Sequence, residues 1–203
     1  MATINKITKL TDKRFVNLYQ FDGKNSKGYE SHYMVASRSE TTDNLKAVTH
    51  TISADGVAIY SLYGENHDKV VLIKQYRYPI DSYIYEFPAG LVEKGEDFNT
   101  AAIRELHEET GLTFTPIQVN PMYTVPRYTT VGLTDETCAI AFGYATGEIS
   151  QNYLEKSEEI EIVLADKEEV KRILKEENVA LLCAYQLMHF IHDTDPFEFL
   201  RNN

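Results

Sequence analysis

The sequence predicts an α/β fold, in which strands and amphipathic helices share one core. Two runs rich in β-branched and aromatic residues, 56–63 and 69–76, are typical of strands. Residues 97–111 are typical of a helix, because Ala101–Ile103 and Leu106 form an apolar stripe. The chain has 203 residues, 43% of them hydrophobic and 25% charged, which suits one globular domain or one domain with a small extension.

The charge and the apolar pattern exclude several classes of protein. A formal net charge of −11 argues against a broad nucleic-acid-binding surface. No run is long and apolar enough to suggest a membrane span or a signal peptide, so we expect a cytoplasmic protein without a membrane partner. Cys138 and Cys183 lie in apolar surroundings and are expected to be buried free thiols.

The amino-terminal part is predicted to be a small antiparallel sheet. Residues 1–13 begin polar and are expected to be loosely ordered. The runs 14–21 and 29–36 are typical of strands, joined into a hairpin by the turn 22–27. Residues 47–52 suggest a third strand.

This predicted hairpin carries several aromatic side chains, namely Phe15, Tyr19, Tyr29 and Tyr33. Large aromatic residues are enriched at protein interfaces. We therefore expect a homodimer in which the strands between residues 14 and 36 contact the partner. The alternative is that they are extra strands of a single sheet.

The helix at 97–111 concentrates negative charge on one face. Asp97 is placed to cap its start, and Gly111 to end it in a left-handed conformation. Glu105, Glu108 and Glu109 stand at positions i, i+3 and i+4, so their carboxylates project from the same face and repel one another. Hard divalent cations prefer such oxygen ligands. The alternative is a solvated acidic face.

The spacing from Gly90 to Leu112 resembles the signature of the Nudix hydrolases, G-x5-E-x7-R-E-U-x-E-E-x-G-U with U aliphatic, and meets every specified position. The resemblance implies an α/β/α sandwich with a mixed sheet, here preceded by the amino-terminal antiparallel sheet. We expect domains at residues 1–53 and 54–203. The implied activity is metal-dependent cleavage of a pyrophosphate joined to another group.

The same resemblance implies roles for individual residues. The metal, Mg²⁺ with Mn²⁺ as an alternative, would be bound by the carboxylates and by a backbone carbonyl. Arg104 would hold the carboxylates in place by pairing with Glu96 or Glu108, and Gly90 would permit a loop conformation that a side chain forbids. The expected metal ligands are Ala89 (carbonyl), Glu105, Glu108 and Glu109.

The stretch 75–90, QYRYPIDSYIYEFPAG, resembles segments of the ADP-ribose and nucleotide-sugar branch of this family. It implies that Arg77 grips a phosphate or carboxylate and that Glu86 accepts hydrogen bonds from the substrate. Tyr29 or Tyr33 could stack on the base. The alternative makes Arg77 and Glu86 a structural ion pair.

The substrate is left open by residues 124–136, where Val131 stands in place of the proline usual in the ADP-ribose branch. The first expectation is hydrolysis of ADP-ribose to AMP and ribose 5-phosphate. The alternatives are another nucleotide sugar such as UDP-glucose or GDP-mannose, a dinucleotide, and a non-catalytic ADP-ribose sensor.

The carboxy-terminal part is predicted to add strands at 114–123, 137–145 and 158–164 and helices at 166–177 and 179–191. Several Nudix enzymes draw a general base from the loop before the last strand. The candidates here are Glu155, Glu158 and Glu159, and the alternative is a run of surface glutamates.

Overall fold

The structure, a computed structural model, describes residues 1–154 and 159–201 and divides the chain into two compact units. The amino-terminal unit contains residues 1–55 together with 126–138. The larger unit contains residues 56–125 and 139–203. The division expected after residue 53 did not include the segment 126–138, which returns to the amino-terminal unit from the middle of the sequence.

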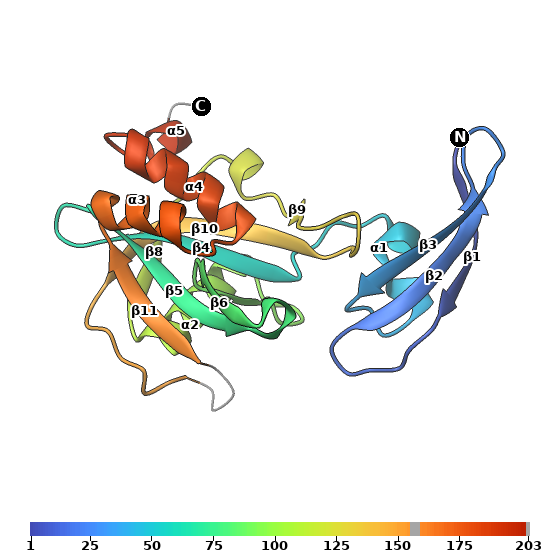
Figure 1. Cartoon of the computed structure of the whole chain (residues 1–203), viewed down its shortest axis with the longest axis horizontal. Coiled ribbons are helices and arrows are strands. Elements are labelled where there is room, and N and C mark those ends of the chain that lie inside the picture. The colour runs from blue at the N-terminus through green and yellow to red at the C-terminus, as the bar shows by residue number, and fades with distance from the viewer. Residues whose placement is uncertain (155–158, 202–203) are drawn as a thin grey trace. The chain divides into compact units, whose positions relative to one another are not determined.

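The amino-terminal unit is built on an antiparallel sheet of order β1-β2-β3, with bounds Thr3–Lys9, Asn17–Lys24 and Glu30–Ser37 (Figure 1). The predicted hairpin is confirmed, and its turn is closed between Asn25 and Tyr29. The expectation of loose order for residues 1–13 was wrong. Polar side chains do not prevent β1 from forming, because its backbone still pairs with the neighbouring strand β2 whatever side chains it carries.

The segment predicted as a third strand at 47–52 is instead a short helix, α1 (Lys46–Thr49), which follows the 3-10 turn η1 (Thr42–Asn44). His50 ends α1 in a left-handed conformation with a φ of 54°. The β-branched residues of this segment misled the strand prediction, since one helical turn and one short strand have similar composition.

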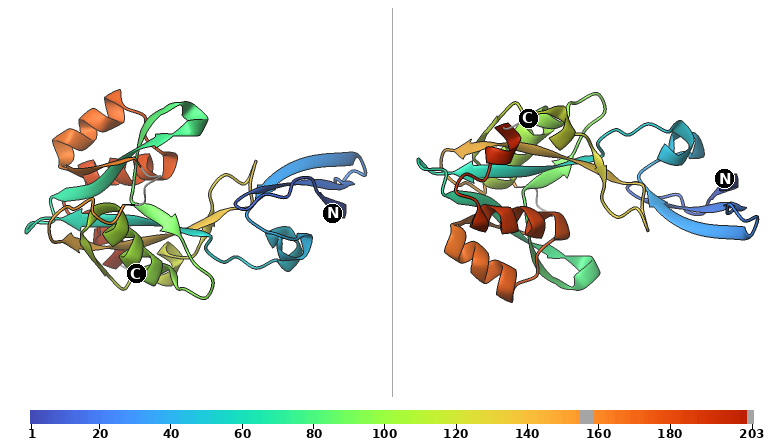
Figure 2. Two further views of the ribbon diagram at one scale, coloured as in Figure 1. Left: turned by 90° about the horizontal axis from the view of Figure 1, so that it is seen from below. Right: turned by 90° about the horizontal axis from the view of Figure 1, so that it is seen from above.

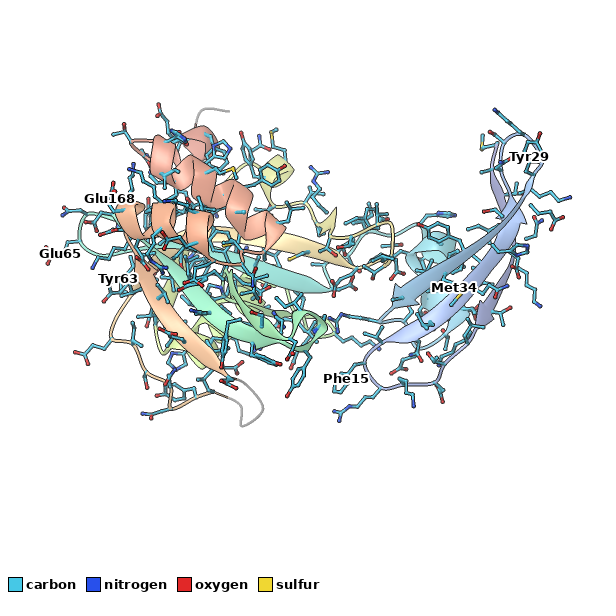
Figure 3. The ribbon with its side chains drawn as sticks, viewed as in Figure 1. Phe15, Tyr29, Met34, Tyr63, Glu65 and Glu168 are labelled. Atoms are coloured by element: carbon cyan, nitrogen blue, oxygen red, sulfur yellow. The ribbon has the colours of Figure 1, made fainter. Side chains whose placement is uncertain are left out.

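One of the four aromatic residues expected at a dimer interface is in the core of this unit. Tyr19 is fully buried, and its hydroxyl donates to the carbonyl of Ser39 at 2.6 Å. Phe15, Tyr29 and Tyr33 are exposed by 65%, 68% and 47%. Tyr29 lies at the tip of the β2–β3 hairpin (Figure 3). Tyr19 is therefore not available to the expected dimer interface, whereas Phe15, Tyr29 and Tyr33 remain accessible.

The larger unit is a mixed sheet between helices, as predicted. Its strand order is β11-β5-β4-β10-β8, with β6 paired to β5 and β7 paired to β4. Helix α2 covers one face, and helices α3 and α4 cover the other (Figure 2). The helices and strands of the chain after α1 have the bounds β4 Gly56–Tyr63, β5 Lys69–Arg77, η2 Tyr78–Ile80, β6 Ser82–Glu86, β7 Ala89–Leu91, α2 Phe98–Thr110, β8 Thr113–Pro116, η3 Pro121–Tyr123, β9 Arg127–Tyr128, β10 Thr137–Thr146, β11 Ile160–Ala165, α3 Lys167–Glu176, α4 Leu181–His192 and α5 Glu198–Arg201.

The short strand β9 and the first two residues of β10 pair within the amino-terminal unit. The strand predicted at 114–123 was too long: β8 ends at Pro116, and Pro121 begins η3. Proline lacks the N–H that a continued strand would need. No helix among the residues that the structure describes is long and apolar enough to cross a membrane.

Side chains of β4 point alternately to the two faces of the sheet and contribute to the core on both faces. Val57 and Ile59 pack with Leu106 of α2 in one buried cluster. Tyr60 points to the opposite face, where its ring stacks on Phe87 at 5.0 Å between centroids. Because successive strand residues face opposite sides, the sheet anchors α2 on one face and an aromatic cluster on the other.

Candidate active site

The segment from Gly90 to Leu112 folds into a strand, a loop and a helix that meet at one depression. Strand β7 pairs with β4 through Val57 and Gly90. Asp97 caps α2, its side chain accepting from the N–H of Asn99 at 2.9 Å. Gly111 ends α2 with a φ of 74°. The predicted cap residues are confirmed, and they set where α2 begins and ends.

Gly90 lets the Glu105 carboxylate lie directly against the backbone of β7. A Cβ at Gly90 would stand 1.8 Å from Cδ of Glu105 and 2.0 Å from its Oε1. Such distances are far below the contact distance of nonbonded atoms. The glycine is therefore required by a close approach rather than by an unusual φ.

Arg104 is bonded to three carboxylates of this site. Its guanidinium donates to Glu96, to Glu105 at 2.7 Å and to Glu108 at 3.1 Å. It also donates to the carbonyl of Leu91 at 3.0 Å, which ties α2 to the end of β7. The expectation named Glu96 or Glu108 as its partner, and the structure shows both together with Glu105.

These bonds shift the titration of the groups involved. The hydrogen bond from Arg104 lowers the pKa of the Glu96 carboxyl, and the backbone N–H of Glu93 lowers it further. The hydrogen bond to Glu96 raises the pKa of Arg104, with further contributions from Glu105 and Glu108. Arg104 is thus a permanent cation whose charge offsets the repulsion among the carboxylates.

Glu109 is the buried member of the triplet, with only 4% of its surface exposed. Its Oε2 accepts from the backbone N–H of Ala89 at 3.0 Å. A charge-assisted bond of this kind holds the carboxylate beside the β6–β7 connection. The three predicted carboxylates and the Ala89–Gly90 backbone are therefore brought together.

The three carboxylates and the Ala89–Gly90 backbone line a depression of about 530 Å³. Its walls are formed by Ala89, Gly90, Leu91, Val92, Glu93, Arg104, Glu105, Glu108, Glu109 and Tyr153. Tyr153 was missed by the sequence reasoning. It lies more than 40 residues beyond the helix, and no spacing in the motif refers to it.

In donor type, these residues fit a hard divalent cation such as Mg²⁺, which takes carboxylate and carbonyl oxygens. Among residues 1–154 and 159–201, however, no three acidic, histidine or cysteine side chains already form a metal cage. Arg104 donates to both Glu105 and Glu108 and so fixes the orientation of these two carboxylates.

The other predicted residues lie outside this depression. Arg77 and Glu86 form an ion pair on the β5–β6 hairpin, with Nε 2.7 Å from Oε2. Tyr33 donates its hydroxyl to the carbonyl of Gly132 at 2.7 Å within the amino-terminal unit, where Tyr29 also lies.

The base candidates Glu155 and Glu158 lie outside the described residues, so the structure adds nothing on them. Glu159 is described, and its carboxylate accepts a hydrogen bond from the hydroxyl of Tyr83. That bond raises the pKa of Tyr83. Glu159 is thus engaged with the β5–β6 hairpin rather than with the depression.

The chain is similar in sequence to a known family and to several known proteins. A NUDIX domain is recognised over residues 53–185. An ADP-sugar pyrophosphatase of Mus musculus is 40% identical over 94 residues, which are 44% of this chain and 43% of that protein. An ADP-ribose pyrophosphatase of Saccharomyces cerevisiae is 29% identical over 159 residues, which are 76% of this chain and 65% of that protein. The chain thus spans less than two thirds of the length of both relatives.

The solved structures show the same fold. The crystal structure of an ADP compounds hydrolase superposes on this chain with a TM-score of 0.66 at 17% sequence identity. The superposition covers 94% of this chain and 91% of the hydrolase chain. Since the NUDIX match covers well over half of the chain and includes the whole glutamate-bearing loop and helix, the chain belongs to the Nudix family.

Proposed function

We propose that this chain hydrolyses the pyrophosphate bond of a nucleoside diphosphate sugar in a Mg²⁺-dependent reaction, with ADP-ribose as the first candidate. Water would add across the bridging P–O bond and give AMP and ribose 5-phosphate. The observation that carries the proposal is the convergence of Glu105, Glu108 and Glu109 with the Ala89–Gly90 backbone on one depression. The similarity to an ADP-sugar pyrophosphatase and an ADP-ribose pyrophosphatase supports the choice of substrate.

In this proposal, the protein's own residues hold the reacting groups in place. Glu109 is fixed by the Ala89 N–H, and Arg104 orients Glu105 and Glu108. Bound Mg²⁺ would neutralise the diphosphate and lower the pKa of a bound water. The base that receives the proton is proposed to come from Glu155, Glu158 or Glu159.

Arg77 and Glu86 are proposed to contact the substrate. Their ion pair is only partly buried, with side chains exposed by 48% and 20%, so it contributes about 0–1 kcal/mol to stability. Arg77→Ala should therefore lower the free energy of unfolding only slightly while raising KM strongly. Strong destabilisation with normal turnover of the folded fraction would instead make the pair structural.

The amino-terminal unit is proposed to form a homodimer through the exposed residues Phe15, Tyr29 and Tyr33, and its tyrosines to stack on the base. The protein is proposed to act in the cytoplasm. Light scattering at micromolar concentration tests the assembly. A species of 23.2 kDa would refute the dimer.

The central experiment is a screen of the purified protein with and without Mg²⁺. The compounds are ADP-ribose, UDP-glucose, GDP-mannose, NADH, diadenosine polyphosphates and oxidised dNTPs, and the readout is phosphate released by a coupled phosphatase. We expect turnover of ADP-ribose that EDTA abolishes. Binding of ADP-ribose without turnover of any compound would refute the proposal and favour a sensor.

A further inference from the structure

Tyr153 adds an aromatic wall to a depression that is otherwise made of backbone and carboxylates. It is contributed by a third segment, separate from β7 and α2. Its surface is 54% exposed. An aromatic ring left this open beside a polar site is available to a ligand.

The imidazole of His107 packs against one side of the Tyr153 ring. This histidine occupies the position between Leu106 and Glu108 that the Nudix spacing leaves unspecified. The imidazole and phenol centroids lie 4.5 Å apart with an angle of 38° between the planes. One side of the Tyr153 ring is thus covered by His107, and the rest remains accessible.

The turn that carries Tyr153 is anchored on its amino-terminal side by two adjacent residues. The N–H of Ser150 donates to the carbonyl of Thr110 at 2.9 Å, at the end of α2. The side chain of Gln151 donates to the carbonyl of Ile160 at 2.8 Å, at the start of β11. The turn itself is closed by a bond from Leu154 to Gln151. The position of Tyr153 is therefore built into the fold.

We infer that Tyr153 binds the sugar ring joined to the second phosphate of the substrate, and that His107 is the positioning residue behind it. This inference rests on the proposed function. The diphosphate would occupy the same depression as the carboxylates, so a ring in its wall would meet a group that is esterified directly to a phosphate. In a nucleoside diphosphate sugar, that group is a sugar, since the base is one ribose further away.

The sugar on the nucleotide side and the terminal sugar are chemically alike, and inhibition by the two products distinguishes them. AMP carries the first sugar, and ribose 5-phosphate carries the second. We expect Tyr153→Ala to raise the Ki of ribose 5-phosphate by about tenfold, the scale of losing one ring contact, and to leave the Ki of AMP within about twofold. The kcat/KM for ADP-ribose should fall by a similar factor, mainly through KM.

Two further variants separate the ring from the hydroxyl and from His107. Tyr153→Phe keeps the ring and should reverse most of the rise in the Ki of ribose 5-phosphate seen in Tyr153→Ala. His107→Ala should raise the Ki of ribose 5-phosphate in the same direction but less, because Tyr153 remains. The control is Tyr185→Ala, an exposed tyrosine, at 61%, on helix α4 of the opposite sheet face, which should change neither Ki.

Three results would overturn the inference. They are unchanged inhibition by both products in Tyr153→Ala, a rise for AMP alone, and an equal rise for both products, which would indicate general distortion. Should Tyr153→Ala not fold, Tyr153→Leu removes the aromatic ring and keeps apolar bulk. If the wild-type protein turns over no ADP-ribose, the proposed function fails before any variant is compared, so the two failures are distinguishable.

Discussion

Substituting Gly90 by alanine tests whether close approach of the Glu105 carboxylate to β7 matters for activity. The added Cβ would stand 1.8 Å from Glu105 Cδ. Since nonbonded carbons pack at about 3.5 Å or more, the carboxylate must move by roughly 1.7 Å. That displacement would also lengthen its 2.7 Å bond to Arg104.

A misplacement of about 1 Å in an active site can lower the rate on the order of a hundredfold, and we expect that loss in kcat for Gly90→Ala. Stability should change by less than about 1 kcal/mol, because the atoms that must move are the end of a flexible side chain. Gly90 does not need a positive φ, so alanine introduces no backbone strain.

A double-mutant cycle supplies the control. In a Glu105→Ala background, the added methyl meets nothing at Glu105, so Gly90→Ala should cause little further loss of kcat. Initial rates with ADP-ribose at saturating Mg²⁺ and urea denaturation of all four proteins complete the assay. Nearly normal kcat in the single variant, or the same fold-loss in both backgrounds, would refute the reasoning.

Other variants test neighbouring parts of the structure. Glu109→Gln should lower kcat by on the order of a hundredfold or more without unfolding the protein, and nearly normal turnover would remove Glu109 from the metal site. Tyr60→Phe should raise the free energy of unfolding by about 1 kcal/mol in urea denaturation, because this fully buried hydroxyl has no partner among the described residues; clear destabilisation would reveal one. Gly111→Asn should destabilise although asparagine tolerates a left-handed φ, since its Cβ would stand 2.7 Å from the Ser150 nitrogen. Gly95→Asn is the matched control, with a φ of 87° and open space, and equal melting temperatures for the two variants would contradict the steric argument.

The glutamate-bearing helix could be predicted almost to the residue because its determinants are local. A cap is decided within three residues of the helix start, and a shared helix face within four. Asp97 and Gly111 therefore stand where the spacing placed them. The central strands β4 and β5 were predictable for a similar reason, since they are short runs rich in β-branched and aromatic residues and bounded by turn residues.

The failures concern contacts between residues distant in sequence. Tyr19 was expected at an interface, and only the fold brings it under the 38–45 segment, where Ser39 accepts its hydroxyl hydrogen bond. Strand β1 is polar, and its existence depends on pairing with β2. Tyr153 reaches the depression because a loop 40 residues past the helix returns to it. Periodicity within a window contains no information on any of these three placements.

Gly111 shows how a short local signal can nevertheless organise a distant segment. Its left-handed φ ends α2, which is the reason the sequence suggests. The structure adds a second reason, because a Cβ there would stand 2.6 Å from Cβ of Ser150. The bare backbone of Gly111 thus lets Ser150 bond to Thr110 and begin the turn that carries Tyr153. The same glycine that terminates the glutamate-bearing helix α2 therefore also makes room for Tyr153 in the wall of the depression, so the motif specifies more of the site than its own residues.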